Sequence, residues 1–489
     1  MSDTGTDTGT PASPSPDAQM AQWRPLAEKA LKGQALESLT RQTADGLPVY
    51  PLYVNTDMAH PSARGDLSPR DAKRPWDLRV AISHPDPKTA NALLLEGLMG
   101  GAASVHLQIC PAGQNGIAVQ SAQDMATVLN NLDLSLAPLS LEAGWHTPQM
   151  LAWAREAAGD QAQQISSLFS PVDHWLATGT SPGPLEGHIL KLANLTANAH
   201  TAHAPARLLC AHAHRVHEAG GSEVQELATI LATAHLYTQH LIRAGLSPED
   251  ALNSLPLSVK VDSHFMLGMA KLRALRTLWA GLCGGYGVDL PAPIVTVSSD
   301  RMLSAQDLET NILRLTAATF AAGVGGADSV ITAPYTAPQQ SPTQHPHALA
   351  RRLARNTQLI AMEEAHLGRV ADPAGGAYAL EAMTQELAEA AWQTFQDIER
   401  QGGLITFIQS IRFSQEIFDK KTKWTQAIQD KQRKIIGVTV YKNSADPSAK
   451  MQDVAFSAPA HALSAKLPGP DSRCTALDAI TVDLAANPQ

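Results

Sequence analysis

The chain has 489 residues, 44% of them hydrophobic, and a formal net charge of −9. This length and composition support one large domain with additions, or two to three ordinary domains, around a buried core. The negative charge without a Lys/Arg cluster argues against a nucleic-acid or anionic-membrane partner, and no apolar run reaches the roughly 18–20 residues of a membrane span.

Targeting and redox features of the sequence favour a cytoplasmic location. The first residues are acidic and no basic residue precedes Arg24, which excludes a secretory signal and argues against a mitochondrial transit peptide. The four cysteines are Cys110, Cys210, Cys283 and Cys474, and they form no CxxC pair. They suit a reducing compartment and predict neither a disulfide framework nor a zinc site.

The N-terminal part of the chain has few signs of a core. Residues 1–19 are rich in Thr, Ser, Pro and Gly and are predicted to be disordered. A helix is expected over 23–32, followed by an extended segment over 49–54. We assign 20–75 to an N-terminal extension. A subunit-contact role for this extension is implied only by the family resemblance given at the end of this section.

Strands and helices alternate from Trp76 onward. Helical periodicity is clearest at 88–99, 223–244 and 264–282. The predicted strands are 77–83, 104–109, 134–141, 166–170, 207–214, 258–262, 294–298 and 329–333. Strands alternating with helices indicate parallel βα units, and eight of them predict an α/β fold of the (β/α)8 TIM-barrel type over 76–340. A doubly wound open sheet is the alternative, but no Gly-rich dinucleotide loop follows a strand.

Helices alone follow the eighth strand. They are predicted over 342–368, 381–401 and 410–432, and together they make a C-terminal helical part at 341–442. Residues 443–489 are rich in Ala, Ser and Pro and have weak periodicity. Most of this tail is predicted to be disordered, and no cobalamin-binding, flavodoxin-like domain can be recognised in it.

Several predicted strands alternate polar and apolar residues, although the strands of an ordinary parallel barrel are apolar on both faces. The polar positions are Arg79, Ser104, His106, Gln108, His212, His214, Thr296 and Ser298. Because the apolar face must meet the surrounding helices, the polar face is expected to point inward. A polar interior is costly unless it is wet or occupied, so the pattern predicts a lumen that holds water or a long polar ligand. An antiparallel or edge-exposed sheet would also alternate, but helices separate nearly all the strands.

Two further groups of residues could carry chemistry. Five histidines lie close together in the sequence: His200, His203, His212, His214 and His217. Imidazole is a common metal ligand, but no carboxylate or thiolate stands at a recognised metal spacing, so lumen lining or polar packing is favoured. Asp262-Ser263-His264 approaches the Asp-x-His-x-x-Gly loop that ligates cobalt in many cobalamin proteins. Its glycine, Gly268, comes one place too late, so we interpret this segment as a strand end that caps a helix.

With these features assembled, the chain resembles the barrel domain of the methylmalonyl-CoA mutase family over residues 23–441. The strongest match is RLARNTQLIAMEEAHLGRVADPAGGA at 352–377, which is similar to the family signature Arg-Ile-Ala-Arg-Asn-Thr, Glu-Glu and Asp-Pro-x-Gly-Gly-Ser. Two positions differ conservatively, Leu353 for Ile and Ala377 for Ser. Shorter matches lie at 23, 32–33, 45–46, 51–53, 218–220, 270–274 and 311–314. The resemblance implies a barrel through which coenzyme A threads and an N-terminal segment that holds subunits together.

Residues that catalytic members of the family use are altered here. Those members carry Ile-Arg-Gln-Tyr-Ala-Gly on the first strand, where the tyrosine helps to drive and shield the radical; residues 78–83 place Ala81 at the tyrosine. At the fifth strand they carry Tyr-His, and the histidine bonds the thioester carbonyl; here His214 and Arg215 stand at those positions. An arginine can donate a hydrogen bond but cannot supply a neutral imidazole. The resemblance therefore implies a degenerate site without catalytic residues.

These departures resemble the small, non-catalytic subunit of heterodimeric methylmalonyl-CoA mutase. The resemblance implies a structural role beside a catalytic large subunit, which would bind adenosylcobalamin and interconvert (R)-methylmalonyl-CoA and succinyl-CoA. It implies no cofactor and no metal held by this chain alone. Two alternatives stay open: an active acyl-CoA mutase barrel that uses a separate cobalamin-binding chain, and a coenzyme A-binding protein without chemistry. If acyl-CoA binds at all, the polar positions of the strands are the expected lining.

Overall fold

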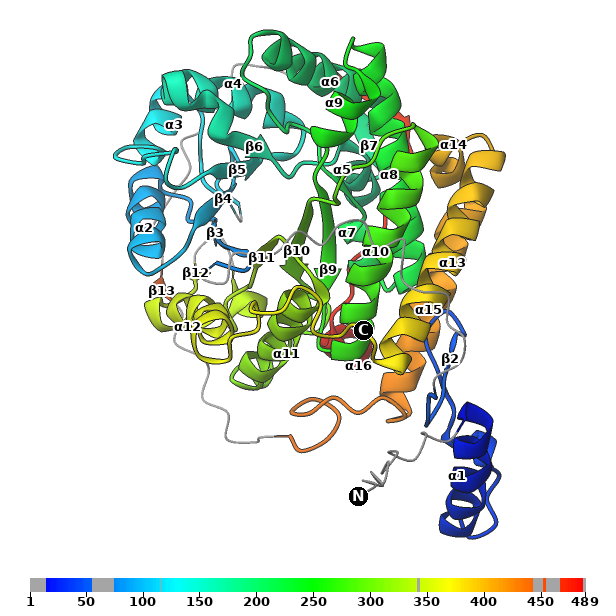
Figure 1. Cartoon of the computed structure of the whole chain (residues 1–489). Helices are drawn as coiled ribbons and strands as arrows, with labels where there is room; N and C mark the ends of the chain where they lie inside the picture. Colours follow the sequence, from blue (N-terminus) through cyan, green and yellow to red (C-terminus); the bar gives the residue numbers. More distant parts are fainter. Residues whose placement is uncertain are drawn as a thin grey trace, which may run out of the picture.

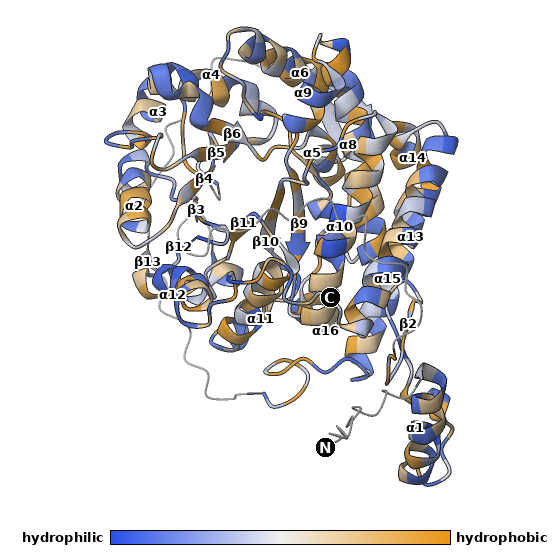
Figure 2. Ribbon diagram, viewed as in Figure 1, coloured by the Kyte–Doolittle hydropathy of each residue, from blue (hydrophilic) through white to orange (hydrophobic). Residues whose placement is uncertain are grey.

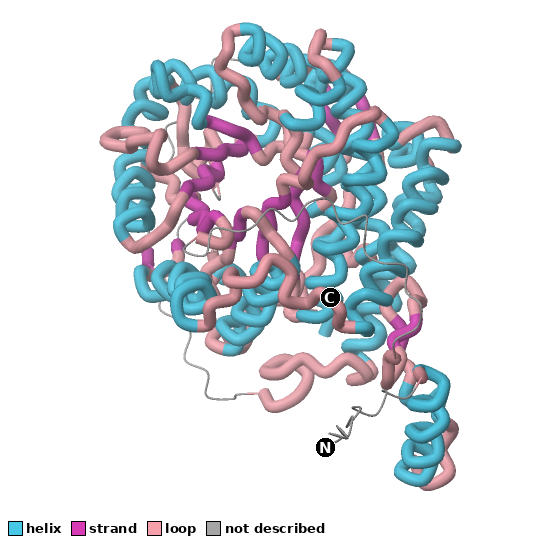
Figure 3. Tube along the Cα trace, viewed as in Figure 1, coloured by secondary structure: helices cyan, strands magenta, loops and turns pink. Residues whose placement is uncertain are grey.

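Eight parallel strands form one strongly curled sheet inside a layer of helices (Figures 1 and 3). The computed structural model describes residues 15–54, 74–114, 116–340, 344–442, 452–453 and 467–486. The strand order is β6-β5-β4-β3-β11-β10-β9-β8. The strands are β3 (Asp77–Ile82), β4 (Ser104–Gln108), β5 (Leu139–Glu142), β6 (Ile165–Ser167), β8 (Ala211–His212), β9 (Leu257–Val261), β10 (Ile294–Ser298) and β11 (Ser329–Ile331).

This order confirms the eight predicted strands and excludes both alternative sheets. The first and last strands of the series, β3 and β11, lie side by side in parallel, which a doubly wound order would not give. The two edge strands also approach each other, since Ser167 donates its backbone N–H to Arg207 (2.7 Å) and Cys210 to Phe169 (3.1 Å). The arrangement is consistent with a TIM-barrel-like domain.

Some predicted strands are shorter than the sequence pattern suggests. The third begins at Leu139 rather than at 134, because the preceding residues form turns. The fifth keeps only Ala211–His212 of the predicted 207–214, and His214 opens the short helix α7 (His214–Glu218) instead. Alternation of polar and apolar residues predicts which residues are buried. It does not predict at which residue the hydrogen bonding between strands begins or ends.

The helices that cover the sheet pack their apolar faces against the outward side chains of the strands. Figure 2 shows hydrophobic and hydrophilic residues mixed along these helices, as amphipathic packing requires. They are α2 (Pro87–Met99), α3 (Ala122–Val128), α4 (Thr147–Ala158), α5 (Pro171–Thr178), α6 (Leu185–Thr201), α8 (Glu223–Arg243), α9 (Pro248–Asn253), α10 (Phe265–Gly285) and α11 (Thr310–Gly325). Helix α8 begins at a capping box in which Ser222 and Gln225 satisfy each other's backbone N–H groups.

The C-terminal helical part packs in two places on the body: its first helix lies beside α11 and β3, and its long second helix lies against α8 and α10 (Figure 1). It contains α12 (Ala348–Leu359), a π-helical turn (Ile360–Glu364), α13 (Tyr378–Arg400), α14 (Leu404–Gln409) and α15 (Ile411–Gln429). The guanidinium of Arg273 on α10 is 2% exposed and contacts Asp372 (3.1 Å) and Glu381 (2.8 Å). Arg273 therefore ties two segments to the barrel helices: the signature at 352–377 through Asp372, and α13 through Glu381.

The N-terminal extension projects from the body (Figure 1). Helix α1 (Pro16–Ala30) starts inside the stretch predicted to be disordered, because Ser15 caps it and a proline stands at its first position. A small hairpin of β1 (Arg41–Gln42) and β2 (Pro48–Val49) follows. Residues 1–14 and 55–73 lie outside the described residues. The predictions of disorder for 1–19 and of an extension for 20–75 fall partly on them.

One part of the C-terminal tail has a defined structure, although the sequence predicts most of 443–489 to be disordered. Residues 467–486 lie on the body: β14 (Pro470–Arg473) pairs antiparallel with β7 (Thr180–Pro182), and α16 (Val482–Ala486) packs beside α15. Asp483 accepts hydrogen bonds from Ser304 (2.7 Å) and from the backbone of Ala305 (2.6 Å). Within 467–486, the weak periodicity reflects pairing with distant parts of the chain.

Within the described residues, no helix is both long enough and apolar enough to cross a membrane.

Candidate functional site

The register of the strands decides which side chains face the inside of the curled sheet. Arg79 pairs with Ser104, Ala81 with His106, and His106 in turn with Ser140. Paired residues of parallel strands point to the same side. Because the intervening Leu78, Val105 and Leu107 belong to the core under the helices, the polar series faces inward. The same reasoning places Gln108 and His212 inside.

A compact hydrogen-bond network occupies the amino-terminal end of the interior. The guanidinium of Arg79 contacts Asp77 (2.7 Å), Ser104 (2.8 Å) and Ser140 (3.2 Å). Asp77 also accepts from the hydroxyls of Ser104 (2.6 Å) and Ser329 (3.0 Å). Arg79 is thus engaged by its own neighbours and spans three strands.

Histidines occupy the middle of the interior. His106 Nδ1 lies 3.0 Å from Ser140 Oγ, and its Nε2 lies 3.6 Å from Glu142. His212 contacts the carbonyl of Leu168 at 3.0 Å through Nε2, and its ring stacks on that of His214 with centroids 4.1 Å apart. Burial, reinforced by the adjacent His212, lowers the pKa of His214 well below its ordinary value. A neutral His214 suits the contact between its Nε2 and Ser258 Oγ (3.0 Å).

The prediction that Thr296 and Ser298 point inward is wrong. They share a face of β10 with Ile294, which packs in the core under the helices. Thr296 donates to the carbonyl of Ser329 (3.2 Å), and Ser298 accepts from the backbone N–H of Ala333 (2.9 Å) while also bordering the cavity at the strand end. Both faces of β10 are largely buried, so the alternation of polar and apolar residues does not decide which face points into the interior.

The apolar side chains of β10 face inward instead and join a cluster of their own. Val295 pairs with Ser258 and Ser329, and Val297 pairs with Lys260 and Ile331. This interior apolar cluster consists of Leu168, Cys210, Val295 and Ile331, with Val297 packed against it. Its members come from strands on different sides of the curled sheet, so they fill part of the space that the sequence had predicted to be polar.

The two altered positions of the family's catalytic motifs lie in different surroundings. Ala81 faces inward and borders the cavity at the carboxyl-terminal end, where its methyl group offers no hydrogen bond. Arg215 lies on α7, is half-buried and donates its backbone N–H to Asp173 (2.7 Å). The described contacts of Ala81 and Arg215 do not involve a ligand. The loss of catalytic function at these two positions therefore stays a prediction.

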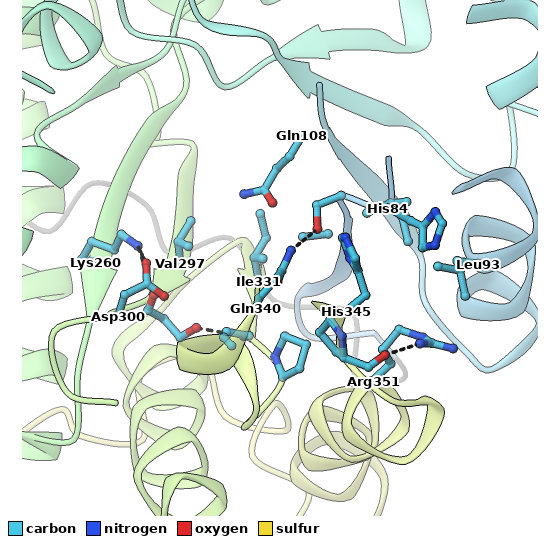
Figure 4. Close-up of a pocket in the computed structure, with 18 residues that line it drawn as sticks. His84, Leu93, Gln108, Lys260, Val297, Asp300, Ile331, Gln340, His345 and Arg351 are labelled. Carbon is cyan, nitrogen blue, oxygen red and sulfur yellow. Dashed lines mark hydrogen bonds and ion pairs between the residues drawn. The ribbon is translucent and has the colours of Figure 1, made fainter. Parts of the chain in front are cut away.

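A cavity of about 180 Å³ remains at the carboxyl-terminal ends of the strands (Figure 4). Gln108, His345 and Gln340 reach toward it from one side and the pair Lys260–Asp300 from the other (Figure 4). The ammonium of Lys260 lies 3.1 Å from Glu218 and 3.3 Å from Asp300. Burial alone would lower the pKa of Lys260, but these two carboxylates raise it, so this lysine is a paired cation.

Sequence reasoning missed Lys260 and its partners. The signal was present, since Ser258 and Lys260 alternate with Val259 and Val261 in the predicted sixth strand, and both polar residues face inward. His345, which is 4% exposed and has no hydrogen-bond partner at Nε2 in the described structure, was missed because the helix predicted over 342–368 includes it. That helix start is wrong: Gln344–His345 form the short strand β12, and α12 begins only at Ala348.

The Asp262-Ser263-His264 segment does not fit a cobalt ligand. Asp262 accepts the backbone N–H of His264 (2.8 Å) and pairs with Arg301 (3.3 Å), so it does not orient the imidazole of His264. Burial alone would raise the pKa of Asp262, but Arg301 holds it well below its ordinary value. The segment does join the end of β9 to the start of α10, but no side chain of it makes a capping hydrogen bond to α10, so the capping part of the interpretation is wrong. Among the described residues no group of three or more metal-binding side chains comes together.

Comparison with the sequences of known proteins identifies the family to which this fold belongs. The family model described as methylmalonyl-CoA mutase matches residues 58–466. The chain is 34% identical over 420 residues to the methylmalonyl-CoA mutase small subunit of Streptomyces virginiae, an alignment that covers 81% of this chain and 66% of that protein. It is 30% identical over 418 residues to the small subunit of Propionibacterium freudenreichii subsp. shermanii, covering 80% and 63%.

A third relative is the methylmalonyl-CoA mutase of Cereibacter sphaeroides, 26% identical over 468 residues and covering 88% of this chain and 65% of that protein. The chain thus spans about two thirds of the length of these relatives. The family match extends over most of the chain and includes every strand of the curled sheet. The chain belongs to the methylmalonyl-CoA mutase family.

Proposed function

We propose that this chain is the structural, non-catalytic small subunit of a heterodimeric methylmalonyl-CoA mutase. The observation that carries the proposal is the filled interior of the sheet, which we take to be a closed (β/α)8 barrel. The Arg79 network occupies its amino-terminal end and the interior apolar cluster its middle. The remaining cavity of about 180 Å³ is smaller than the roughly 300–1,000 Å³ of pockets for drug-sized ligands. A coenzyme A threaded through the barrel would have to displace these side chains.

The altered motif positions support the same role. Ala81 cannot shield or drive a radical, and Arg215 cannot act as a neutral hydrogen-bonding imidazole. The catalytic large subunit would bind adenosylcobalamin, which supplies the radical chemistry, and would interconvert (R)-methylmalonyl-CoA and succinyl-CoA. The present chain would contribute the surface on which that subunit is held.

The N-terminal extension is the part of the chain best suited to contact the large subunit. Within 15–54 no side chain that the structure describes is buried. Trp23 is half-buried and Leu26 is 68% exposed, although both are large and apolar. Only the base of the extension is fixed to its own body, where Asp45 accepts from the backbone N–H of Val224 (3.2 Å) and pairs with Lys420 (3.7 Å). Exposed aromatic and apolar residues of this kind commonly become interface anchors.

Activity and ligand binding test the structural role. The purified chain with adenosylcobalamin and methylmalonyl-CoA should form no succinyl-CoA, and calorimetric titration with coenzyme A should give no measurable heat of binding. Turnover after addition of a separate cobalamin-binding protein would favour an active barrel. Tight coenzyme A binding without turnover would favour a binding protein.

Deletion of residues 1–60 tests the interface. The truncated chain should no longer co-purify with a catalytic large subunit, while its far-UV circular dichroism stays that of a folded α/β protein. Deletion of residues 1–14, which leaves α1 in place, is the matched control and should retain the partner. Unchanged affinity of the longer deletion would place the interface elsewhere.

A further inference from the structure

A second, larger hollow lies outside the sheet, between the N-terminal extension and the body. Its volume is about 1,190 Å³, which exceeds the roughly 300–1,000 Å³ of common small-molecule sites. One wall is the segment 41–53, and the opposite wall is formed by α15 and by the loops that follow β8, β9 and β10. We call this hollow the extension cleft.

The extension cleft is positively charged, although the chain as a whole is negative. Its basic residues are Arg41, Arg301, Lys420, Lys423 and Arg433, and its acidic residues are Asp45, Glu223 and Asp262. Two of the three carboxylates are used within the wall, since Asp45 pairs with Lys420 and Asp262 with Arg301. Glu223 alone therefore faces the remaining three cations.

Arg433 and Trp424 carry hydrogen-bond donors that the described structure leaves without acceptors. Guanidinium groups lie over the Trp424 ring at 5.6 Å for Arg301 and 5.9 Å for Arg433. Arg433 forms no described ion pair, and the indole N–H of Trp424 is buried without a hydrogen-bond partner. A desolvated guanidinium and a buried N–H are both costly when they are left unsatisfied.

We propose that the extension cleft binds an oxyanion, phosphate or carboxylate, carried by a small molecule with a planar ring. Arg433 would hold the oxyanion, because a planar guanidinium recognises such groups with two parallel hydrogen bonds. Lys423 adds a second positive charge at the same wall. The aromatic lining by Tyr50, Tyr378 and Trp424 suits a flat ring, and the volume admits a molecule of the size of a nucleotide.

Calorimetric titration of the full chain tests the site. The probes are ADP, which joins a ring to phosphate, pyridine-2,6-dicarboxylate, which joins a ring to carboxylates, and adenosine, which has the ring alone. We expect one of the first two to bind with a Kd below about 1 mM, and which one it is tells phosphate from carboxylate. Adenosine should bind at least about tenfold more weakly than ADP.

The variant Arg433→Gln should weaken binding of the better probe by at least about tenfold. Lys434→Gln is the matched control, because Lys434 is an exposed neighbour outside the cleft lining, and it should leave the affinity unchanged. Arg433→Gln should lower the Tm of the ligand-free chain only slightly, since Arg433 has no described ion pair and loses only its contact with the Trp424 ring. If it does unfold, Arg433→Lys, which keeps the charge and loses the planar fork, should weaken binding instead. The proposal is overturned if neither oxyanion probe binds, if adenosine binds as tightly as ADP, or if the Arg433 and Lys434 variants bind alike.

Discussion

The substitution Glu226→Gln should destabilise the protein more than its small change in shape suggests. Glu226 lies on α8, is fully buried and accepts three hydrogen bonds: from the backbone N–H of Lys260 (2.9 Å), from Lys271 Nζ (2.8 Å) and from His217 Nδ1 (3.1 Å). The first goes to one carboxylate oxygen and the other two to the second. A glutamine keeps one acceptor oxygen but turns an NH2 group toward the buried ammonium of Lys271.

The magnitude follows from the electrostatics of the site. Burial alone would raise the pKa of Glu226, but Lys271 and His217 lower it from 4.5 to about 2. At 1.36 kcal/mol per pH unit this corresponds to about 3 kcal/mol of stabilisation at neutral pH. Removing one partner of a buried ion pair costs about 3–5 kcal/mol by experience with other proteins. We therefore expect Glu226→Gln to lower the free energy of unfolding by about 3–5 kcal/mol.

Urea unfolding followed by circular dichroism at pH 7 measures this loss. Glu389→Gln is the matched control: Glu389 is exposed on α13, and its substitution should change the free energy of unfolding by less than about 0.5 kcal/mol. The pair Glu226→Gln with Lys271→Met removes the ammonium that faces the amide and keeps an acceptor for the backbone N–H of Lys260, so it should recover part of the loss. A Glu226→Gln variant within about 1 kcal/mol of the parent, with an unchanged m-value, would refute the electrostatic reasoning.

The pH dependence has a definite sign. The pKa of Glu226 is lower in the folded protein than in the unfolded chain, so its stabilisation is present above pH 4.5 and is lost as the pH falls toward 2. The difference in stability between the parent and Glu226→Gln should therefore be smaller at pH 3.5 than at pH 7, by about 1–2 kcal/mol. A difference that grows at low pH would contradict the assignment.

Three further changes test other parts of the structure. Arg273→Met removes a buried guanidinium that contacts the partly buried carboxylates of Asp372 and Glu381, so the free energy of unfolding measured in urea should fall by about 2–4 kcal/mol; a loss below 1 kcal/mol would mean that these ion pairs do not hold α13. Truncation after residue 466 removes the partner of β7 and the carbonyl of Gly469 that accepts the backbone N–H of Gly183. Mass spectrometry should therefore show faster amide hydrogen exchange at 180–183, where residue 182 is a proline without an amide hydrogen, and unchanged exchange would mean that β14 does not pair in solution. Ile331→Ala opens a void in the interior apolar cluster and should cost about 2–5 kcal/mol in the same urea assay, whereas no loss would mean that the interior is not packed.

The parts of the fold that follow local periodicity could be predicted from the sequence. All eight strands and the long helices α2, α8 and α10 appear where apolar spacing indicates them. Helix α11 begins only at Thr310, because the backbone N–H of Ser304 donates to the side chain of Asn311 and holds the preceding residues in a turn. Hydrophobic periodicity depends on burial. It therefore does not predict the residue at which a helix begins when a hydrogen bond between a side chain and the backbone shifts that start.

The inner and outer faces of the strands could be predicted only in part. Arg79, His106 and Gln108 face inward as expected because their apolar neighbours pack outward under the helices. Thr296 and Ser298 face outward because the register with β9 and β11 brings Val295 and Val297 to the inside. The register of β10 depends on both strands that pair with it. The sequence of β10 alone therefore does not decide which of its faces points inward.

The pairing of β7 with β14 has a consequence for how the chain is made. Pro182 meets Pro470, so 288 residues must leave the ribosome after β7 before its partner exists. At 5–20 residues per second this interval is roughly 15–60 s, during which the rest of the barrel can already have folded. Throughout that time β7 is an unpaired strand edge, the kind of surface that recruits other chains. The nascent protein therefore has a defined period of vulnerability in which binding of a chaperone at 180–182 would be most useful, and it ends only when the tail docks.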